Sequence, residues 1–548
     1  MNHQNTFATN EQVGSVNTLS ETVKYQTDPL AIFHQLSQNS DNNLLLESAE
    51  IDKKHQLKSL LLTDAALKIT CHANVVTFEA LTKNGQAALE FAQQQLAEHA
   101  ALTFNKNSFI AVFPEITQQL DEKSRLLAIN PFQSLRLFNQ LKNISGHPFA
   151  VFLGGVFAFD MMSMTEELPT VSNGDNTCPD FVYYLAETVV VIDHEAQSTE
   201  VIGNVFSGNK ANNNLAAIRQ RLADIKNILA QQYIAHEIPV ANASGSPIEK
   251  NDVSSDISDE QFCNTVNQLK ENIRAGDIFQ VVPSRTFTLS CSNTLNAYKA
   301  LKQSNPSPYM FYLKDSDFCI FGASPESALK YQHKNRQVEI YPIAGTRPRG
   351  FNKDGSISLD LDSRIELELR LDKKELAEHT MLVDLARNDI ARVSQAGTRY
   401  VADLLKVDRY SHVMHLVSRV CGTLDLDLDA LHAYQACMNM GTLSGAPKVK
   451  ATQLIREVEG KRRGSYGGAV GYLTGDGEMD TCIVIRSAFV KHGIAHVQAG
   501  AGVVYDSDPQ SEANETKQKA QAVINAIQNA ELFTIEISAM PNKENNHA

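Results

Sequence analysis

The sequence predicts an α+β protein in which two large, mainly antiparallel sheets stack as a central β-sandwich with helices on the outside. Two observations predict this fold. Apolar stretches of strand length recur in both halves of the chain, and the turns between many of them are short, so that neighbouring strands can pair as hairpins. Longer segments with an apolar stripe at helical spacing lie between groups of strands, where they can cover the outer faces of the sheets.

The composition predicts a soluble, cytoplasmic protein with reduced thiols. Its 548 residues include 43% hydrophobic and 20% charged residues, with a formal net charge of −14. This charge, with no block of Lys and Arg, argues against binding nucleic acid. None of the eight cysteines lies in a paired spacing. The polar N-terminus lacks a signal sequence, and the most apolar run, residues 149–162, is too short to span a bilayer, so we expect no membrane contact.

The amino-terminal half is expected to fold as one region behind a tail. Residues 1–22 are expected to form a disordered tail, and residues 23–240 are expected to form a regulatory and structural region. The expected helices are 27–38, 85–101, 134–141 and 212–233. The expected strands are 44–50, 58–63, 66–71, 75–81, 149–159, 180–193 and 200–206. Residues 241–258 are rich in Ser, Asn, Asp, Gly and Pro, which predicts a linker.

The carboxy-terminal half, residues 259–532, is expected to form a second region, followed by a tail at 533–548. The expected helices are 259–275, 372–393 and 429–438. The expected strands are 278–289, 309–314, 318–323, 328–332 and 337–343. Three more apolar strands are expected after residue 464, and the second holds residues 483–489. The last leads into a helix with Ser507 or Asp508 as its cap and Pro509 near its first position.

Two pairs of glutamates stand on helices that are far apart in the sequence. Glu512 and Glu515 share one helical face just beyond Gly500-Ala501-Gly502, where two glycines without a Cβ let a ligand approach the backbone. Glu375 and Glu378 repeat the spacing on an earlier helix. Four carboxylates suit Mg²⁺, which prefers oxygen ligands. Two solvated helix faces are the alternative explanation of the same pattern.

An arginine stands inside one of the expected strands. Arg486 follows the apolar residues 483–485, and a charge at such a position needs an acidic partner or an anionic ligand. A salt-bridged core arginine and an anion-binding arginine both fit this pattern. The glycine-rich segments lack the spacing of a Walker loop and the third glycine of a dinucleotide site, which argues against nucleotide binding.

Six motifs in the carboxy-terminal half resemble the chorismate-utilising enzymes. They are Phe279–Arg285, Pro306–Met310, Pro342–Arg347, Leu385–Asp389, Gly441–Lys448 and Ala499–Glu515. Within this family the chain is most similar to the anthranilate synthases, because Leu45–Ala49 resembles their tryptophan-sensing motif. Gln280 stands where isochorismate synthases place a lysine, and Ala344 where aminodeoxychorismate synthases often carry one. Those two enzymes are the alternatives within the family, and an inactive tryptophan-binding regulatory protein is the alternative outside catalysis.

The resemblance implies a Mg²⁺ site and a chorismate site. The metal-binding glutamates of the family match Glu378 and Glu515, with Glu375 and Glu512 as direct or water-mediated supports. The cation would hold the ring carboxylate of chorismate. The residues that match substrate contacts are Gly345, Thr346, Tyr466, Arg486, Gly500, Ala501 and Gly502. Of these, Tyr466 and Arg486 would hold the enolpyruvyl carboxylate, because a guanidinium binds a carboxylate in two bonds.

The resemblance also implies a reaction in two stages. Ammonia adds at C2 of chorismate as the C4 hydroxyl leaves, and Glu326 matches the proposed general acid for that hydroxyl. Pyruvate is then eliminated and the ring becomes aromatic, which gives anthranilate. His415 matches the histidine associated with this elimination, and Thr442 lies close to it. For His415, a structural hydrogen bond is the alternative role.

The implied partners are a second subunit and a regulatory amino acid. No cysteine lies in the Gly-x-Cys-x-Gly context of a glutaminase, so a separate glutamine amidotransferase subunit is expected to supply ammonia, with free ammonia as the alternative. Two large and two small subunits would form a heterotetramer. L-Tryptophan is expected to inhibit by binding both halves of the chain. The matching residues are Glu47, Ser48, Pro308, Tyr309 and Met310.

Overall fold

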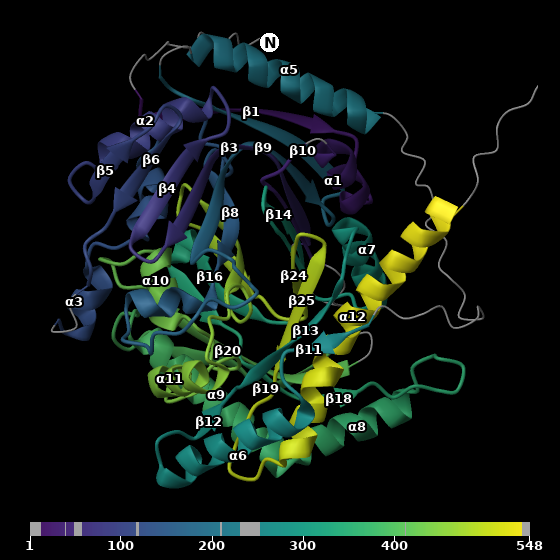
Figure 1. The fold of residues 1–548 in the computed structure, drawn as a ribbon. Coiled ribbons are helices and arrows are strands. Elements are labelled where there is room, and N and C mark those ends of the chain that lie inside the picture. The colour runs from purple at the N-terminus through teal and green to yellow at the C-terminus, as the bar shows by residue number, and fades with distance from the viewer. Residues whose placement is uncertain are drawn as a thin grey trace, which may run out of the picture.

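The computed structural model describes residues 13–38, 40–48, 57–116, 120–208, 211–230, 252–410 and 413–539. In this part of the chain, 23 strands are joined by backbone hydrogen bonds into one sheet that divides into two layers (Figure 1). The division occurs at two long antiparallel strands, β3 (Lys58–His72) and β9 (Phe181–Asp193). Their register shifts between Leu62 and Leu67, and each strand pairs with different neighbours on either side of that point. The predicted pair of stacked sheets is therefore present, joined through two shared strands.

The first layer extends from the ends of β3 and β9 that pair Lys58 with Asp193. On one side, β9 continues to β10 (Ser198–Phe206), β1 (Ser15–Val23) and β7 (Lys142–Asn143). On the other, β3 continues to β2 (Asn43–Glu47), β14 (Tyr309–Lys314), β15 (Cys319–Ser324), β24 (Ser487–Lys491), β25 (Ile494–Gly500), β13 (Ser284–Ser290) and β11 (Ser254–Ser255). Strands from both halves of the sequence alternate in this layer, so neither half completes it alone.

The second layer extends from the opposite ends of the same two strands. Here β3 continues to β4 (Val75–Ala80), β6 (Ser108–Val112) and β5 (Ala101–Phe104). On the other side, β9 continues to β8 (Phe152–Phe157), β22 (Ala469–Thr474), β23 (Met479–Ile483), β16 (Ser327–Gln332), β17 (Gln337–Ile340) and β20 (Val413–Thr423). Both β18 (Ile343–Pro348) and β19 (Tyr400–Arg409) also pair with β20. A separate short ladder joins β12 (Gln280–Val281) to β21 (Gly445–Ala446).

The main core lies between the two layers, and helices cover the outer faces. Phe152, Val182 and Val470 from the second layer pack in one cluster with Phe311 and Phe489 from the first. The first layer is covered by α1 (Pro29–Ser37), α5 (Ala211–Ala230), α7 (Thr294–Ser304) and α12 (Pro509–Ala539). The second is covered by α2 (Gly85–Leu96), α4 (Gln133–Arg136), α9 (Lys373–Ala391) and α10 (Ala430–Cys437). The remaining helices are α3 (Glu122–Leu127), α6 (Asp259–Ala275), α8 (Leu359–Leu371), α11 (Lys448–Glu459) and the 3₁₀ turns η1 (Leu137–Gln140), η2 (Phe159–Met164) and η3 (His333–Asn335).

The structure corrects several predicted boundaries. Residues 15–22 of the expected tail belong to β1, because eight of its residues pair along β10. The helix expected over 85–101 ends at Leu96, and residue 101 begins β5. The strand expected over 44–50 ends at Glu47, and its last two residues lie outside the described part. Most of the expected linker also lies outside, and α12 continues past residue 532 to Ala539. No described helix is long and apolar enough to span a membrane.

Two crossings between the layers bring distant residues together. The chain leaves β15 in the first layer and enters β16 in the second through Pro325 and Glu326. It returns from β23 to β24 through residues 484–486. The two crossings are hydrogen bonded to each other, because the Ile483 amide donates to the Glu326 carbonyl at 3.0 Å and the Ala323 amide donates to the Arg486 carbonyl at 3.1 Å. Glu326 and Arg486 therefore lie side by side where the layers meet.

Candidate active site

Arg486 does not lie inside a continuous strand, as the sequence predicted, but in the break between β23 and β24. Its φ of +49° is in the left-handed region, which is unusual for a residue with a Cβ. Among the described residues, none forms a hydrogen bond or ion pair with its guanidinium. Burial lowers the pKa of Arg486, and the nearest charge partners are Tyr466, Glu515 and Glu326. A partly buried guanidinium of this kind is suited to bind a carboxylate ligand.

Glu326 is a buried carboxyl at the other crossing. Its side chain accepts a hydrogen bond from Thr442 Oγ1 at 3.0 Å, and Thr442 stands in the loop before α11. Burial raises the pKa of Glu326 to about 8, although the bond from Thr442 acts in the opposite direction. A carboxyl with this pKa carries its proton at neutral pH. It can therefore act as a general acid there.

His415 lies on β20 directly opposite Thr346 on β18. Its Nδ1 is 2.9 Å from Thr346 Oγ1, and its ring meets the ring of Tyr410 edge to face at 5.3 Å. Burial, and then the charge of Arg486, lower the pKa of His415 to about 4. The imidazole is therefore neutral at neutral pH and is able to accept a proton. The sequence did not predict β19 and β20, the hairpin that holds this residue.

Two glycine positions leave bare backbone at the same place. Gly345 has a φ of +81°, and a Cβ there would stand 3.1 to 3.3 Å from Leu416, Glu375 and Leu369. A Cβ on Gly500 would be 2.8 Å from the Pro283 carbonyl and 3.1 Å from Tyr466 Oη. A larger residue at Gly345 would therefore displace side chains and hold a strained φ, and one at Gly500 would need the backbone at Pro283 to move. The run 500–502 begins at Gly500, the last residue of β25, which lies beside the buried Tyr466.

The four predicted metal-binding glutamates lie near the amino-terminal ends of α9 and α12, with Glu375 and Glu512 in the first turns and Glu378 and Glu515 one turn later. Burial, followed by the charges of Glu375, Glu512 and Glu515, raises the pKa of Glu378 to about 7, so all four carboxylates share one electrostatic neighbourhood. Burial also raises the pKa of Glu512. For Glu515, burial alone would raise the pKa, but Lys519 and the nearby cations hold it below its usual range. The amino-terminal ends of α9 and α12 thus meet, although 137 residues separate Glu378 from Glu515 in the sequence.

Basic side chains contact the carboxylates of this acidic cluster. Arg347 Nη1 donates to Glu375 at 2.9 Å, Lys374 is 3.8 Å from Glu378, and Lys519 is 2.6 Å from Glu515. No group of three or more potential ligands is close enough to hold a metal ion among the residues that the structure describes. The chemistry of the donors nevertheless fits Mg²⁺, because all four side chains are carboxylates, and burial together with the charges of the neighbouring glutamates raises the pKa of Glu378.

Lys519 is a site residue that the sequence analysis missed. Its ammonium group contacts Glu515 and also donates to the Gly500 carbonyl at 3.0 Å, so it joins the acidic cluster to the glycine run. The spacing of four residues from Glu515 was the available signal, since residues at i and i+4 are neighbours on a helix. Gln280 was noticed only by resemblance, and the structure places its amide 3.0 Å from a Cβ built on Gly502.

The predicted regulatory residues meet at the seam between the two halves of the chain. Glu47 on β2 pairs with Met310 on β14. Its buried carboxylate accepts a hydrogen bond from Tyr298 Oη at 2.7 Å and forms an ion pair with Lys302. Ser48 is half-buried just beyond β2, and Pro308 and Tyr309 stand at the start of β14. The structure thus brings the two motifs together, while the binding of tryptophan there stays a prediction.

The fold and the site define an enzyme of the chorismate-utilising class. Solved structures with this fold include anthranilate synthase component I from Streptococcus pneumoniae, at 28% identity and a TM-score of 0.63, covering 87% of this chain and 94% of that one. The menaquinone-specific isochorismate synthase of Escherichia coli also has a TM-score of 0.63, over 94% of this chain and 95% of its own, but only 17% identity, so it supports the fold alone.

The chain belongs to the chorismate binding enzyme family, whose profile matches residues 86–525. It is 55% identical to anthranilate synthase component 1 of Vibrio parahaemolyticus over 522 residues, which is 95% of this chain and 94% of the relative. It is also 55% identical to the Escherichia coli protein of the same name over 509 residues, or 92% of this chain and 96% of the relative. These relatives match the chain over nearly its full length.

Proposed function

We propose that this chain is the large subunit of a Mg²⁺-dependent anthranilate synthase, which aminates chorismate and eliminates pyruvate as the first committed step of tryptophan biosynthesis. The observation that carries the proposal is the pair of side chains at the layer crossings. A protonated Glu326 lies beside the Arg486 guanidinium, which has no hydrogen-bond or ion-pair partner in the described part of the structure, in a chain 55% identical to named anthranilate synthase subunits. A carboxylate substrate held by the guanidinium would therefore lie within reach of a proton donor.

In the first stage, Arg486 and Tyr466 would bind the enolpyruvyl carboxylate of chorismate. Glu326 would give its proton to the C4 hydroxyl, which leaves as water while ammonia forms the bond to C2. Burial raises the pKa of Glu326 enough for its carboxyl group to be protonated at neutral pH, and the hydrogen bond from Thr442 orients that carboxyl group. General acid catalysis of this type typically contributes about 100-fold or more to the rate.

In the second stage, the neutral imidazole of His415 would accept the proton that the ring loses at C2. The bond between C3 and the enolpyruvyl oxygen then breaks, pyruvate leaves and the ring becomes anthranilate. Thr346 fixes the orientation of the imidazole through Nδ1. If Nδ1 donates to Thr346 Oγ1, Nε2 keeps the lone pair that receives the proton.

The acidic cluster is proposed to hold Mg²⁺ through Glu378 and Glu515, with Glu375 and Glu512 in support. When bound, the cation would neutralise the ring carboxylate of chorismate next to the backbone of the glycine run. Arg347, Lys374 and Lys519 contact or approach three of these carboxylates in the structure, and their positive charges balance the cluster. Glu375, Glu378 and Glu515 would each exchange such a contact for one with the metal ion.

The ammonia is proposed to come from a glutaminase subunit that docks on a groove between α9 and β19. The groove has a volume of about 850 Å³, and Met381, Tyr400 and Leu404 are among its lining residues. Tyr400 and Leu404 are more than half exposed. Exposed apolar side chains in one patch are typical of protein interfaces. α9 also carries Glu378, and β19 pairs with the strand of His415, so a subunit seated there would contact two elements connected to the site.

This docking surface is tested by comparing two sources of ammonia. The variant Leu404→Glu should lose glutamine-dependent activity when mixed with the glutaminase subunit and keep its activity with an ammonium salt. Ile144→Glu is the matched control, because Ile144 is as exposed as Leu404, at 57%, but follows β7 at the far edge of the first layer. Normal glutamine-dependent activity of the first variant would place the partner on another surface.

L-Tryptophan is proposed to inhibit from the seam where Glu47 faces Met310. A ligand that contacts both β2 and β14 would favour one arrangement of the two halves over another, and the resulting shift in substrate affinity is an allosteric effect. Lys302 and Tyr298 hold the Glu47 carboxylate, which is the group best placed to bind an α-amino group.

The product assay is the decisive experiment for the activity. Purified protein incubated with chorismate, Mg²⁺ and an ammonium salt should form fluorescent anthranilate and one equivalent of pyruvate. Isochorismate or 4-amino-4-deoxychorismate as the product would overturn the proposal in favour of the related enzymes. Absence of any product, with tryptophan still bound, would support a regulatory protein without catalysis.

A further inference from the structure

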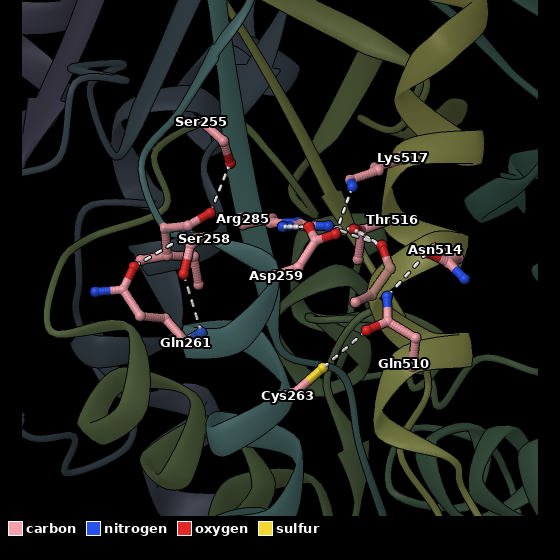
Figure 2. A network of polar contacts seen from close by, with 12 residues as sticks. Ser255, Ser258, Asp259, Gln261, Cys263, Arg285, Gln510, Asn514, Thr516 and Lys517 are labelled. Atoms are coloured by element: carbon pink, nitrogen blue, oxygen red, sulfur yellow. Dashed lines mark hydrogen bonds and ion pairs between the residues drawn. The ribbon is translucent and has the colours of Figure 1, made fainter.

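A buried arginine lies between the strand that leads into the glycine run and the helix that carries Glu512 and Glu515. Arg285 stands on β13 directly opposite Ala499, and only 1% of it is exposed. Figure 2 shows its guanidinium between α6, which contributes Asp259, and α12, which contributes Thr516 and Lys517. The proposed reaction assigns no role to this residue.

The guanidinium is held by three hydrogen bonds of normal length. Nε donates to Thr516 Oγ1 at 2.9 Å, Nη2 donates to the Ala513 carbonyl at 2.8 Å, and Nη1 donates to Asp259 at 2.8 Å. The rings of Phe262 and Phe287 lie 5.2 and 5.3 Å from the guanidinium carbon. A buried charge whose three nitrogens each donate a hydrogen bond, one of them to an acidic partner, resists displacement, because each lost contact leaves it less compensated.

Two of these hydrogen bonds are accepted by residues of α12 that directly follow Glu512 and Glu515. Ala513 directly follows Glu512, and Thr516 directly follows Glu515. An α-helix is rigid over one turn, and the guanidinium is a planar group with donors at fixed angles. Two hydrogen bonds from the planar guanidinium to residues three positions apart on α12 therefore restrict both the rotation of the helix about its axis and its position along that axis.

The same arginine also fixes the helix relative to the glycine run. Ser284 and Arg285 pair with Gly500 and Ala499, so β13 holds the start of the run. Lys519, further along α12, donates to the Gly500 carbonyl at 3.0 Å. Arg285 and Lys519 thus both join α12 to the strands at the glycine run, and of these two side chains Arg285 is the fully buried one.

We propose that Arg285 is a positioning residue for the divalent-cation site, which sets the orientation of Glu512 and Glu515 against Gly500–Gly502. This inference rests on the proposed function, because it takes the acidic cluster to bind Mg²⁺. Outer residues that orient metal ligands typically change metal affinity by about 10-fold or more when they are replaced. A residue with only a structural role would lower stability without a selective change in Mg²⁺ binding.

The test compares Arg285→Lys with a matched variant, Arg456→Lys. Lysine keeps the charge but replaces the planar fork with a single donor group. Arg456 is also buried and bonded to one acid and one backbone carbonyl, but it lies on α11 and contacts Asp160 and Pro169. Mg²⁺ binding is measured by isothermal titration calorimetry without chorismate, together with the melting temperature. We expect Arg285→Lys to weaken Mg²⁺ binding about 10-fold and Arg456→Lys to leave it unchanged.

Each result of the test supports or overturns the inference. A folded Arg285→Lys variant with wild-type Mg²⁺ affinity would overturn it, as would equal weakening in both variants. If Arg285→Lys does not fold, Thr516→Val keeps the shape of the side chain but removes the hydroxyl, which accepts from Arg285 Nε and donates to the Ala513 carbonyl. The inference requires this variant to bind Mg²⁺ more weakly than the wild type. Wild-type protein that binds no Mg²⁺ would instead contradict the metal site of the proposed function, so the two failures are distinguishable.

Discussion

The two ends of the candidate active site control charge in opposite ways. At the buried end, Glu326 and His415 are removed from water, and burial shifts the pKa of each group toward its neutral form, to about 8 for the acid and about 4 for the base. At the acidic end, the glutamates of α9 and α12 lie near one another, and basic side chains contact three of them.

This difference assigns different tasks to the two ends. A neutral acid and a neutral base can exchange protons with a substrate without a counter-ion, because neither carries a charge at rest. A cluster of carboxylates is repulsive and becomes more stable when a cation binds. The buried end should therefore respond to pH, and the acidic end should respond to the concentration of divalent cations.

The largest effect is expected from Glu515→Gln at the acidic end. Loss of a metal-binding carboxylate removes charge stabilisation of several kcal/mol, so kcat/KM should fall by about 1,000-fold. Activity is measured as anthranilate formation at saturating ammonium and increasing Mg²⁺. Glu457→Gln, an exposed position on α11, is the control and should behave as wild type. Undiminished turnover by Glu515→Gln would remove this residue from the metal site.

The second effect is expected from Glu326→Gln at the buried end. Glutamine has the shape of the acid but no proton to give, so kcat should fall by about 100-fold. The pH profile provides a sharper measurement. The protonated form is present below the pKa of about 8 and is lost above it, so the wild-type rate should decline as the pH rises through 8. The variant should lack this decline, and a decline of unchanged size would contradict the role.

The third effect is smaller and separates positioning from proton transfer. Thr442→Val removes the hydroxyl that donates to Glu326, and a net hydrogen bond is worth about 1 kcal/mol, which corresponds to about a fivefold loss in rate. Because that bond lowers the pKa of Glu326, its removal should move the alkaline decline to higher pH. Thr442→Ser keeps the hydroxyl and should restore the wild-type profile. A shift to lower pH would show that the bond acts differently.

The smallest effect on catalysis is expected from Ser48→Ala, which lies outside both ends. It should weaken inhibition by tryptophan and change uninhibited kcat by less than about twofold, because surface changes away from a site rarely exceed 0.5 kcal/mol. Rates are compared across a tryptophan titration. Unchanged inhibition would place the tryptophan site elsewhere. A large loss of activity without tryptophan would show that Ser48 also affects catalysis.

Most of the fold was predictable because its signals are local. The cap and proline of α12 are confirmed, since the Asp508 side chain accepts from the Ser511 amide at 2.8 Å and the helix begins at Pro509. The prediction of one strand over 483–489 was wrong. The chain crosses between the layers within this range, but the residues on both sides of the crossing are apolar, so the local sequence does not show the break. The hairpin of β19 and β20 was missed, since β19 alternates charged and apolar residues on a largely exposed edge.

The sequence by itself determined the periodicity of the strands and helices, the paired glutamates and the motifs that place the chain in its family. Only the tertiary structure decided which side chains carry protons and which charges are matched. The acidity of Glu326 depends on burial between two layers and on Thr442, which is 116 residues away in the chain. Desolvation and Coulomb interactions depend on distance in space. That distance is set by how the two crossings pack, and no local sequence pattern indicates it.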